Sequence, residues 1–176
     1  MKPDVQRIVV LGAESTGKST LAAALAKHYR TTWVPEYLRT FVELHQRTPR
    51  ADEQFMIATT QRQHEADSES LANRFLFCDT SPLMTAIYSE HYFGSVDTAL
   101  ASLAAQYDYA ATIVTAPTMP WRPDGLQRES DDVRQHIHTH LIRVLHDTNI
   151  AYRMIDGDVE DRVTQVIDYL ATLNLQ

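Results

Sequence analysis

Residues 12–19 of the chain read Gly-Ala-Glu-Ser-Thr-Gly-Lys-Ser and fit the spacing of a phosphate-binding loop. A short apolar run, Ile8 to Leu11, precedes the loop, and a stretch rich in Ala and Leu follows it from Leu21 to Tyr29. The run suits a buried parallel strand, and the stretch suits a helix. Such a unit directs successive backbone N–H groups and the positive end of the helix dipole toward one point, where a polyphosphate binds. It therefore predicts an α/β fold that binds a nucleoside triphosphate.

Two side chains of this loop have specific expected roles. Lys18 is expected to reach the terminal phosphates of ATP, and Ser19 is expected to bind Mg²⁺. The predicted nucleotide-binding residues of the loop are Gly12, Ala13, Glu14, Ser15, Thr16, Gly17, Lys18, Ser19 and Thr20. The alternative is a chance Gly-Lys-Ser turn at the surface, which the flanking strand and helix disfavour.

Composition narrows the class of protein. The chain has 176 residues, 44% of them hydrophobic and 22% charged, which is typical of one soluble globular domain. A formal net charge of −7 argues against a nucleic-acid partner, and no apolar run approaches the ~18 residues of a membrane helix. No signal peptide is visible, and the single cysteine, Cys78, is expected to be a buried residue in a reducing environment. These features predict a cytoplasmic protein with a small-molecule partner; a homo-oligomer is compatible with them.

Predicted strands and helices alternate along the whole chain. Strands are expected near residues 7–11, 31–34, 75–78, 110–114 and 151–155. Helices are expected near residues 18–29, 37–45, 51–73, 81–91, 96–106, 130–148 and 159–173. Alternation of this kind indicates a parallel sheet that is covered by helices on both faces. We therefore expect residues 1–176 to form a single P-loop kinase domain with a five-stranded parallel sheet.

Asp79 is a second candidate for chemistry, because it directly follows the apolar run Phe75 to Cys78. Ligands bind at the carboxyl edge of an open parallel sheet, and a carboxylate there commonly holds Mg²⁺ in folds with a phosphate-binding loop. Asp79 is therefore predicted to be a metal ligand together with Ser19. The alternative is that Asp79 caps the following helix, although Ser81 can supply that cap by itself.

Glu36 follows the predicted second strand and is expected at the same edge of the sheet. Its carboxylate can accept hydrogen bonds from substrate hydroxyls or take the proton from an attacking hydroxyl. Tyr37 offers a flat aromatic face, and Arg39 offers a cation that can bridge to phosphate. The alternative is an acidic residue favoured by the dipole of a helix first turn, with Arg39 on a solvated face.

Residues 116–129 form a long stretch with three prolines and a glycine, so no regular element is expected over most of it. Long loops in compact domains are usually lids or disordered segments. This stretch carries Trp121, Arg122 and Arg128 and follows the predicted fourth strand. It is therefore predicted to be a mobile lid that closes over the triphosphate, neutralises charge and excludes water. The alternative is a surface loop with incidental arginines.

Two further patterns are less specific. His136, His138 and His140 alternate along a predicted helix, and we interpret them as a solvated helix face because the Glu of a H-E-x-x-H metal motif is absent. The turn Ile155 to Asp158 follows the last strand. Such turns often lie beside the adenine ring in kinases of this shape, with Arg162 near; a plain turn before a helix is the alternative.

Together these segments resemble the ribosylnicotinamide kinase domain of NadR-like bacterial proteins. The matching motifs are the loop from Gly12 to Thr20, Glu36-Tyr37-x-Arg39, Asp79-Thr80, and Trp121-x-x-Asp124-Gly125-Leu126-x-Arg128. They run through nearly the whole chain, and the Glu-Ser-Thr of the loop and the last motif are the most discriminating. The chain departs from the family pattern at Ser81, where an acidic residue often follows Asp-Thr.

The resemblance implies a kinase that uses ATP and Mg²⁺ to phosphorylate the 5′-hydroxyl of nicotinamide riboside, which yields nicotinamide mononucleotide for NAD biosynthesis. The implied catalytic residues are Lys18, Glu36, Asp79 and Arg128, with Glu36 favoured over Asp79 as the base. The implied substrate-binding residues are Glu36, Tyr37, Arg39, Asp79, Trp121 and Asp124. Among them, Trp121 and Tyr37 are expected to face the pyridinium cation, because aromatic faces attract cations.

Two alternatives to this function stay open. One is a kinase that acts on another nucleoside or small metabolite. The other is an ATP-binding regulatory switch. Guanine-binding switches typically carry Asn-Lys-x-Asp and Asp-x-x-Gly elements, neither of which occurs at a suitable place, since Asp79 is followed by Thr80-Ser81-Pro82. Their absence favours a kinase.

Overall fold

The computed structural model describes residues 4–123 and 130–175, and every structural statement below refers to these residues. The strands are β1 (Gln6–Leu11), β2 (Trp33–Val34), β3 (Phe75–Asp79), β4 (Ala111–Thr115) and β5 (Arg153–Ile155). They form one sheet in the order β2-β3-β1-β4-β5, and every neighbouring pair is parallel. The predicted five-stranded parallel sheet is therefore confirmed.

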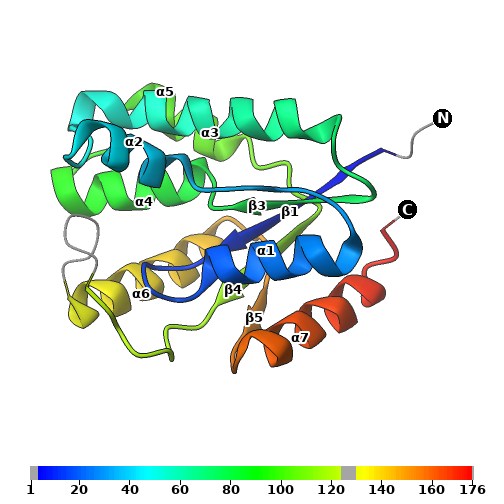
Figure 1. Ribbon diagram of the computed structural model, residues 1–176. Coiled ribbons are helices and arrows are strands. Elements are labelled where there is room, and N and C mark those ends of the chain that lie inside the picture. The colour runs from blue at the N-terminus through cyan, green and yellow to red at the C-terminus, as the bar shows by residue number, and fades with distance from the viewer. Residues whose placement is uncertain (1–3, 124–129, 176) are drawn as a thin grey trace.

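Helices cover both faces of this sheet (Figure 1). Residues of α1 (Lys18–Tyr29) and α7 (Val159–Thr172) share one apolar core with the sheet, centred on Ile8, Val10 and Ile113. Residues of α4 (Pro82–Phe93) and α6 (Asp131–Asp147) share the other core, centred on Val9, Leu11 and Val114. Alternate residues of β1 thus point into opposite cores, as expected for a central strand that is buried on both sides.

The remaining helices form an outer group on the α4 side, visible at the top of Figure 1. They are α2 (Tyr37–His45), the short 3₁₀ helix η1 (Ala51–Glu53), α3 (Gln54–Glu69) and α5 (Thr98–Ala105). Small residues of α3, α4 and α5 pack together around Leu100. Phe41 and Val42 of α2 pack on Ile57 of α3. This group builds the wall that faces the carboxyl edge of β2 and β3.

Local sequence signals explain where several helices begin and end. Pro82 occupies the first turn of α4, where its missing N–H costs nothing, and Gly94 ends the helix in a left-handed conformation. Ser130 and Asp158 cap α6 and α7 by accepting hydrogen bonds from the N–H groups of Val133 and Asp161.

Two elements are shorter than the sequence pattern predicts. The helix expected over 51–73 is instead η1 followed directly by α3, which ends at Glu69. The Glu53 side chain accepts a hydrogen bond from the Arg50 N–H at 2.8 Å and so caps the start of η1. The strand expected over 31–34 pairs only at Trp33 and Val34. The Thr31 hydroxyl instead donates to the Phe75 carbonyl and accepts from the Asn73 N–H, which ties the turn before β3 to this point.

Two further features of the described residues concern membrane spans and the single cysteine. Among the residues described, no helix is long and apolar enough to cross a membrane. Cys78 is fully buried inside β3, and this burial raises the pKa of its thiol. A buried thiol of raised pKa is a poor nucleophile, in agreement with its interpretation as a core residue.

Candidate active site

The phosphate-binding loop connects β1 to α1 and owes its shape to two glycines. Gly12 has a φ of 156° and Gly17 a φ of 83°, both in the region that side chains disfavour. A Cβ atom on Gly12 would stand only 2.2 Å from the Thr115 Oγ1 atom at the end of β4. The Thr115 hydroxyl lies 2.6 Å from the Thr16 hydroxyl, so the loop is fastened to the carboxyl edge of the sheet.

Ser19 and Asp79, which were predicted to hold the metal together, are in direct contact. The Ser19 hydroxyl donates a hydrogen bond of 2.5 Å to the Asp79 Oδ2 atom. Asp79 is 1% exposed, and its Oδ1 atom is buried without a hydrogen-bond partner among the described residues. Asp79 therefore does not act as the cap of α4. Ser81 holds the cap position, although its side chain makes no capping hydrogen bond.

This pair fits a magnesium ion better than a metal that needs several protein ligands. Among the described residues, no group of three or more His, Cys, Asp or Glu side chains could hold a metal ion. Mg²⁺ is usually held by one or two carboxylates, with water and substrate phosphates completing its octahedral shell. One hydroxyl, one buried carboxylate and an adjacent phosphate-binding loop meet that requirement.

Lys18 begins α1, and its ammonium group donates a hydrogen bond of 3.0 Å to the Ala13 carbonyl. The ammonium thus lies across the loop rather than in solvent. A phosphate group bound to the backbone N–H groups of the loop would meet this charge directly. The role of Lys18 toward the terminal phosphates stays a prediction.

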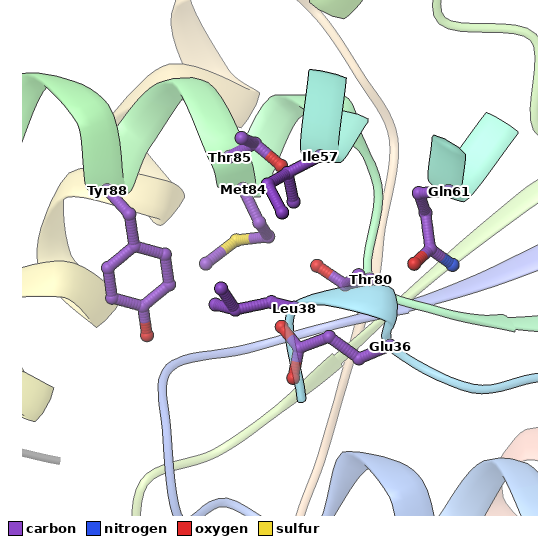
Figure 2. Close-up of a pocket in the computed structure, with 8 residues that line it drawn as sticks. All are labelled: Glu36, Leu38, Ile57, Gln61, Thr80, Met84, Thr85 and Tyr88. Carbon is purple, nitrogen blue, oxygen red and sulfur yellow. The ribbon is translucent and has the colours of Figure 1, made fainter. Parts of the chain in front are cut away.

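A pocket of about 340 Å³, partly open to solvent, lies between the β2–α2 turn and α4 (Figure 2). It is lined by Glu36, Leu38, Ile57, Gln61, Thr80, Met84, Thr85 and Tyr88. Glu36 lies on one side in Figure 2 and Tyr88 on another, with Met84 and Leu38 between them. Thr80 directly follows Asp79, so the pocket adjoins the predicted metal site.

Gln61 connects the two backbone segments that carry the acidic residues at this pocket. Its side-chain carbonyl accepts the Tyr37 N–H at 2.8 Å, and its amide donates to the Pro35 carbonyl at 3.3 Å and to the Asp79 carbonyl at 3.4 Å. Gln61 is 2% exposed. One buried side chain of α3 therefore connects the turn that carries Glu36 to the strand end that carries Asp79.

Tyr37 and Arg39 do not line this pocket. The Tyr37 ring packs edge-on against His64, with ring centroids 5.4 Å apart. Arg39 is exposed on α2. Both follow Glu36 in sequence, but the start of α2 turns their side chains away from the pocket that Glu36 enters.

The described part of the predicted lid lies against the phosphate-binding loop. The Arg122 N–H donates to the Ser15 hydroxyl at 3.2 Å. A Cβ atom on Gly17 would stand 3.0 Å from the Met119 sulfur. Trp121 is partly buried in the same segment. Asp124 and Arg128, which the sequence places in the same lid, lie outside the described residues.

Two buried arginines support the loop from behind. Arg134 of α6 donates to the Ser15 carbonyl at 3.2 Å and to the Met119 carbonyl at 2.6 Å. Arg162 of α7 donates to the Thr16 carbonyl at 2.5 Å and to the Gly157 carbonyl at 2.8 Å. They are 4% and 2% exposed. Arg162 thus contacts the loop itself as well as the turn at Asp156–Asp158 that was expected near the adenine.

Sequence reasoning missed four residues of this site. Thr115 could have been found by the argument that identified Asp79, since it is a polar residue at the carboxyl end of a strand. Arg134 stands in the first turn of the helix after the lid, which is a weak signal. Gln61 and Tyr88 lie within long helical stretches, and nothing in the local sequence distinguishes them from their neighbours.

The histidines of α6 do not form a metal site. His140 lies 3.2 Å from Glu90, and the rings of His91 and His136 have centroids 5.4 Å apart. His138 is partly buried, and this burial lowers its pKa. The expected solvated face is therefore found only in part: His136 is exposed, whereas His138 and His140 are partly buried.

The parallel sheet, the loop between β1 and α1, and the carboxylate at the end of β3 define a P-loop nucleotide-binding domain. Residues 7–162 match the family described as AAA domain, and the chain belongs to that family. It is similar to the trifunctional NAD biosynthesis/regulator protein NadR of Escherichia coli (strain K12), with 28% identity over 170 residues and 93% of this chain covered. The protein of the same name from Salmonella typhimurium is also 28% identical. The expected resemblance to NadR-like proteins is thereby confirmed.

Solved structures with the same fold include a NadR protein in complex with NR, with a TM-score of 0.80 and 21% identity over 97% of this chain and 53% of that one. Thymidylate kinase from Candida albicans has a TM-score of 0.68 and 13% identity over 96% of this chain and 92% of that one. The chain covers only 42% of the length of the curated NadR relatives.

Proposed function

We propose that this protein is a kinase that transfers the γ-phosphoryl group of ATP to the 5′-hydroxyl of nicotinamide riboside. The observation that carries the proposal is the Ser19–Asp79 contact beside the phosphate-binding loop, with the Glu36 pocket adjoining it. Similarity to NadR proteins, which are named for NAD biosynthesis, and to a NadR structure that holds NR supports this substrate.

On the donor side, backbone N–H groups of residues 12–17 and the Lys18 ammonium would bind the phosphates of ATP. Ser19 and Asp79 would hold Mg²⁺, which neutralises charge on the β- and γ-phosphates when it is bound. Arg162, behind the loop, would keep the loop in shape near the nucleotide. Arg128 is assigned to the transferring phosphoryl group through the resemblance alone.

On the acceptor side, Glu36 would take the proton from the 5′-hydroxyl of the substrate. The oxygen of that hydroxyl would form a bond to the γ-phosphorus as the bond from the γ-phosphorus to ADP breaks and ADP leaves. A general base must lie within hydrogen-bond reach of the proton that it removes, and Glu36 lines the pocket that adjoins the loop. Asp79 is the alternative base. Its contact with Ser19 favours the metal role, which leaves Glu36 for the proton.

Four further assignments rest on the family pattern. Trp121, Tyr37, Arg39 and Asp124 would contact the acceptor once it is bound. Tyr37 and Arg39 lie outside the pocket in this structure, so their assignment requires a movement of the start of α2. Trp121 already lies in the segment that contacts the loop.

The direct test is to incubate the protein with ATP, Mg²⁺ and nicotinamide riboside and to measure the mononucleotide. Lys18→Ala should lower kcat more than ~100-fold, because one preorganised charge at the transferring group is lost. The exposed Lys27 of the same helix supplies the control, Lys27→Ala. Equal activity of both variants would contradict the phosphate assignment.

A panel of acceptors separates the two other candidate functions. A strong preference for uridine or a deoxynucleoside would identify a kinase of another nucleoside. Slow ATP hydrolysis that no acceptor stimulates would favour the regulatory switch instead.

A further inference from the structure

Tyr88 is the one aromatic residue among the described residues that line the pocket. Its ring comes from the middle of α4 and stands across the pocket from Glu36 (Figure 2). The residues that the sequence assigned to an aromatic face were Tyr37 and Trp121. Since Tyr37 packs on His64 instead, the pocket obtains its aromatic wall from another helix.

The Tyr88 hydroxyl is fixed by the phosphate-binding loop. It donates to the Glu14 Oε2 atom at 2.6 Å and accepts from the Glu14 N–H at 3.1 Å. Burial, together with the negative charge of Glu14 and Glu36, raises the pKa of this phenol well above its ordinary value. The phenol therefore stays protonated and keeps donating to Glu14, which holds the ring in one orientation.

Glu14 contributes negative charge that the described residues do not neutralise. It is 9% exposed, and its Oε1 atom is buried without a hydrogen-bond partner. No lysine, arginine or histidine in residues 4–123 and 130–175 forms an ion pair with it. A carboxylate kept from water without a counter-charge raises the affinity of the site for a cation.

We infer that Glu14 and Tyr88 form a charge-selective wall that favours an acceptor with a positively charged aromatic ring over a neutral one. The Tyr88 ring offers its π-electrons to the cation, and Glu14 at the hydroxyl end of the ring and Glu36 across the pocket supply the negative field. This inference rests on the proposed function and deepens it, because it states which residues recognise the pyridinium ring. The same wall disfavours acceptors that carry an anionic ring substituent.

The test compares two acceptors that have nearly the same shape, nicotinamide riboside and its reduced, uncharged dihydropyridine form. At saturating ATP, the wild-type protein should prefer the cationic acceptor in kcat/KM. Glu14→Gln and Tyr88→Leu should each lower that preference by ~3- to ~30-fold, mainly through KM of the cation. A merely structural defect would lower the rates with both acceptors equally and leave their ratio unchanged.

Two control variants remove the same chemical groups elsewhere, Glu43→Gln on the exposed side of α2 and Tyr152→Leu before β5. Both should keep the wild-type ratio. If Tyr88→Leu fails to fold, Tyr88→Phe keeps the ring while removing the bond to Glu14, and it should lower the ratio less than Glu14→Gln does.

The outcomes separate this inference from the function beneath it. A wild-type protein that phosphorylates neither acceptor would overturn the proposed function. A wild-type protein that phosphorylates the cation, with Glu14→Gln and Tyr88→Leu or Tyr88→Phe retaining the full ratio, would overturn the charge-selective wall alone.

Discussion

Gly12 is the residue whose lack of a side chain most directly determines the shape of the phosphate-binding loop. The loop can approach the end of β4 only if residue 12 has no side chain, because a Cβ atom would stand 2.2 Å from Thr115 Oγ1 and 2.9 Å from Thr16 Oγ1. Those two hydroxyls are already hydrogen-bonded to each other, so neither can easily move away. The backbone N–H groups that would bind phosphate depend on this fit.

Gly12→Ala should destabilise the protein by about 1–3 kcal/mol through overpacking and should weaken ATP binding. Urea unfolding and nucleotide titration measure the two effects. Gly94→Ala is the matched control, because Gly94 also has a positive φ but no atom within 4 Å of its would-be Cβ. Equal losses of stability in the two variants would show that close packing at Gly12 does not matter. Adding Thr115→Ala to Gly12→Ala should restore part of the loss.

The position of a site residue could be predicted from the sequence when that residue stands at the end of a predicted strand. Asp79 and Glu36 each stand at the end of a predicted strand, and parallel strands bring such ends to one edge, so their proximity to the loop follows from the sequence. Tyr88 and Gln61 were not predictable in this way. Their roles come from the crossing of α3 and α4 over that edge, which no local pattern encodes.

At the scale of elements, α3 acts as a brace between β2 and β3. Gln61 is its contact point, with one acceptor and two donors used on the backbone of Pro35, Tyr37 and Asp79. The sequence predicted a longer helix here, over 51–73. It did not predict that the first turn is a 3₁₀ helix capped by the Glu53 side chain at the Arg50 N–H, or that α3 ends at Glu69.

Gln61→Met should raise KM for the acceptor about tenfold, since three buried backbone groups lose their partner and the Glu36 turn is no longer held. KM for ATP should change little. Gln63→Met places the same side chain on the exposed face of α3 and serves as the control. Steady-state kinetics with each substrate varied in turn give both constants. An acceptor KM that matches the control would rule out the bracing role.

The first turn of α6 is a second brace, joining the lid segment to the phosphate-binding loop. Arg134→Met removes the group that bonds both the Ser15 and the Met119 carbonyls. It should cost about 2 kcal/mol of stability and raise KM for ATP, because charged hydrogen bonds in a buried site are lost. Arg143→Met, at an exposed position of the same helix, is the control. Unchanged KM for ATP in Arg134→Met would mean that the loop keeps its shape without this arginine.

In the whole molecule, the candidate active site lies at the carboxyl edge of the sheet, and a buried cluster of charged residues lies at the opposite edge. The carboxyl ends of β1 to β4 bring together the loop, Asp79, Glu36 and Thr115. The alternation of strands and helices allowed us to predict all of these except Thr115. At the amino edge of the sheet, at the start of β1 and just before β4, lies a buried ionic cluster that no pattern in the sequence indicates. Glu65 of α3 is fully buried there, with Arg62 at 2.6 Å, Arg7 at 3.7 Å and the Tyr109 hydroxyl at 2.9 Å. Its members are far apart in the sequence, so only the fold brings them together.

This cluster should make stability depend on pH. Burial outweighs the two arginines and raises the pKa of Glu65 from 4.5 to about 7. The folded protein thus binds this proton more tightly than the unfolded chain, so the stabilising contribution is complete below pH 4.5 and is lost as the pH rises through 7. Because one pKa unit corresponds to about 1.4 kcal/mol, the loss approaches about 3 kcal/mol.

Urea unfolding of the wild type and of Glu65→Gln between pH 5 and 8 measures this effect as the difference between the two proteins. Other titrating groups, including the histidines, are common to both and cancel in that difference. The wild type should lose stability relative to Glu65→Gln across this range. Glu69→Gln, which removes a half-exposed partner of Arg7, should instead run parallel to the wild type. Parallel curves for Glu65→Gln as well would mean that the arginines keep Glu65 ionised throughout, and that this edge of the sheet has no proton-linked stability.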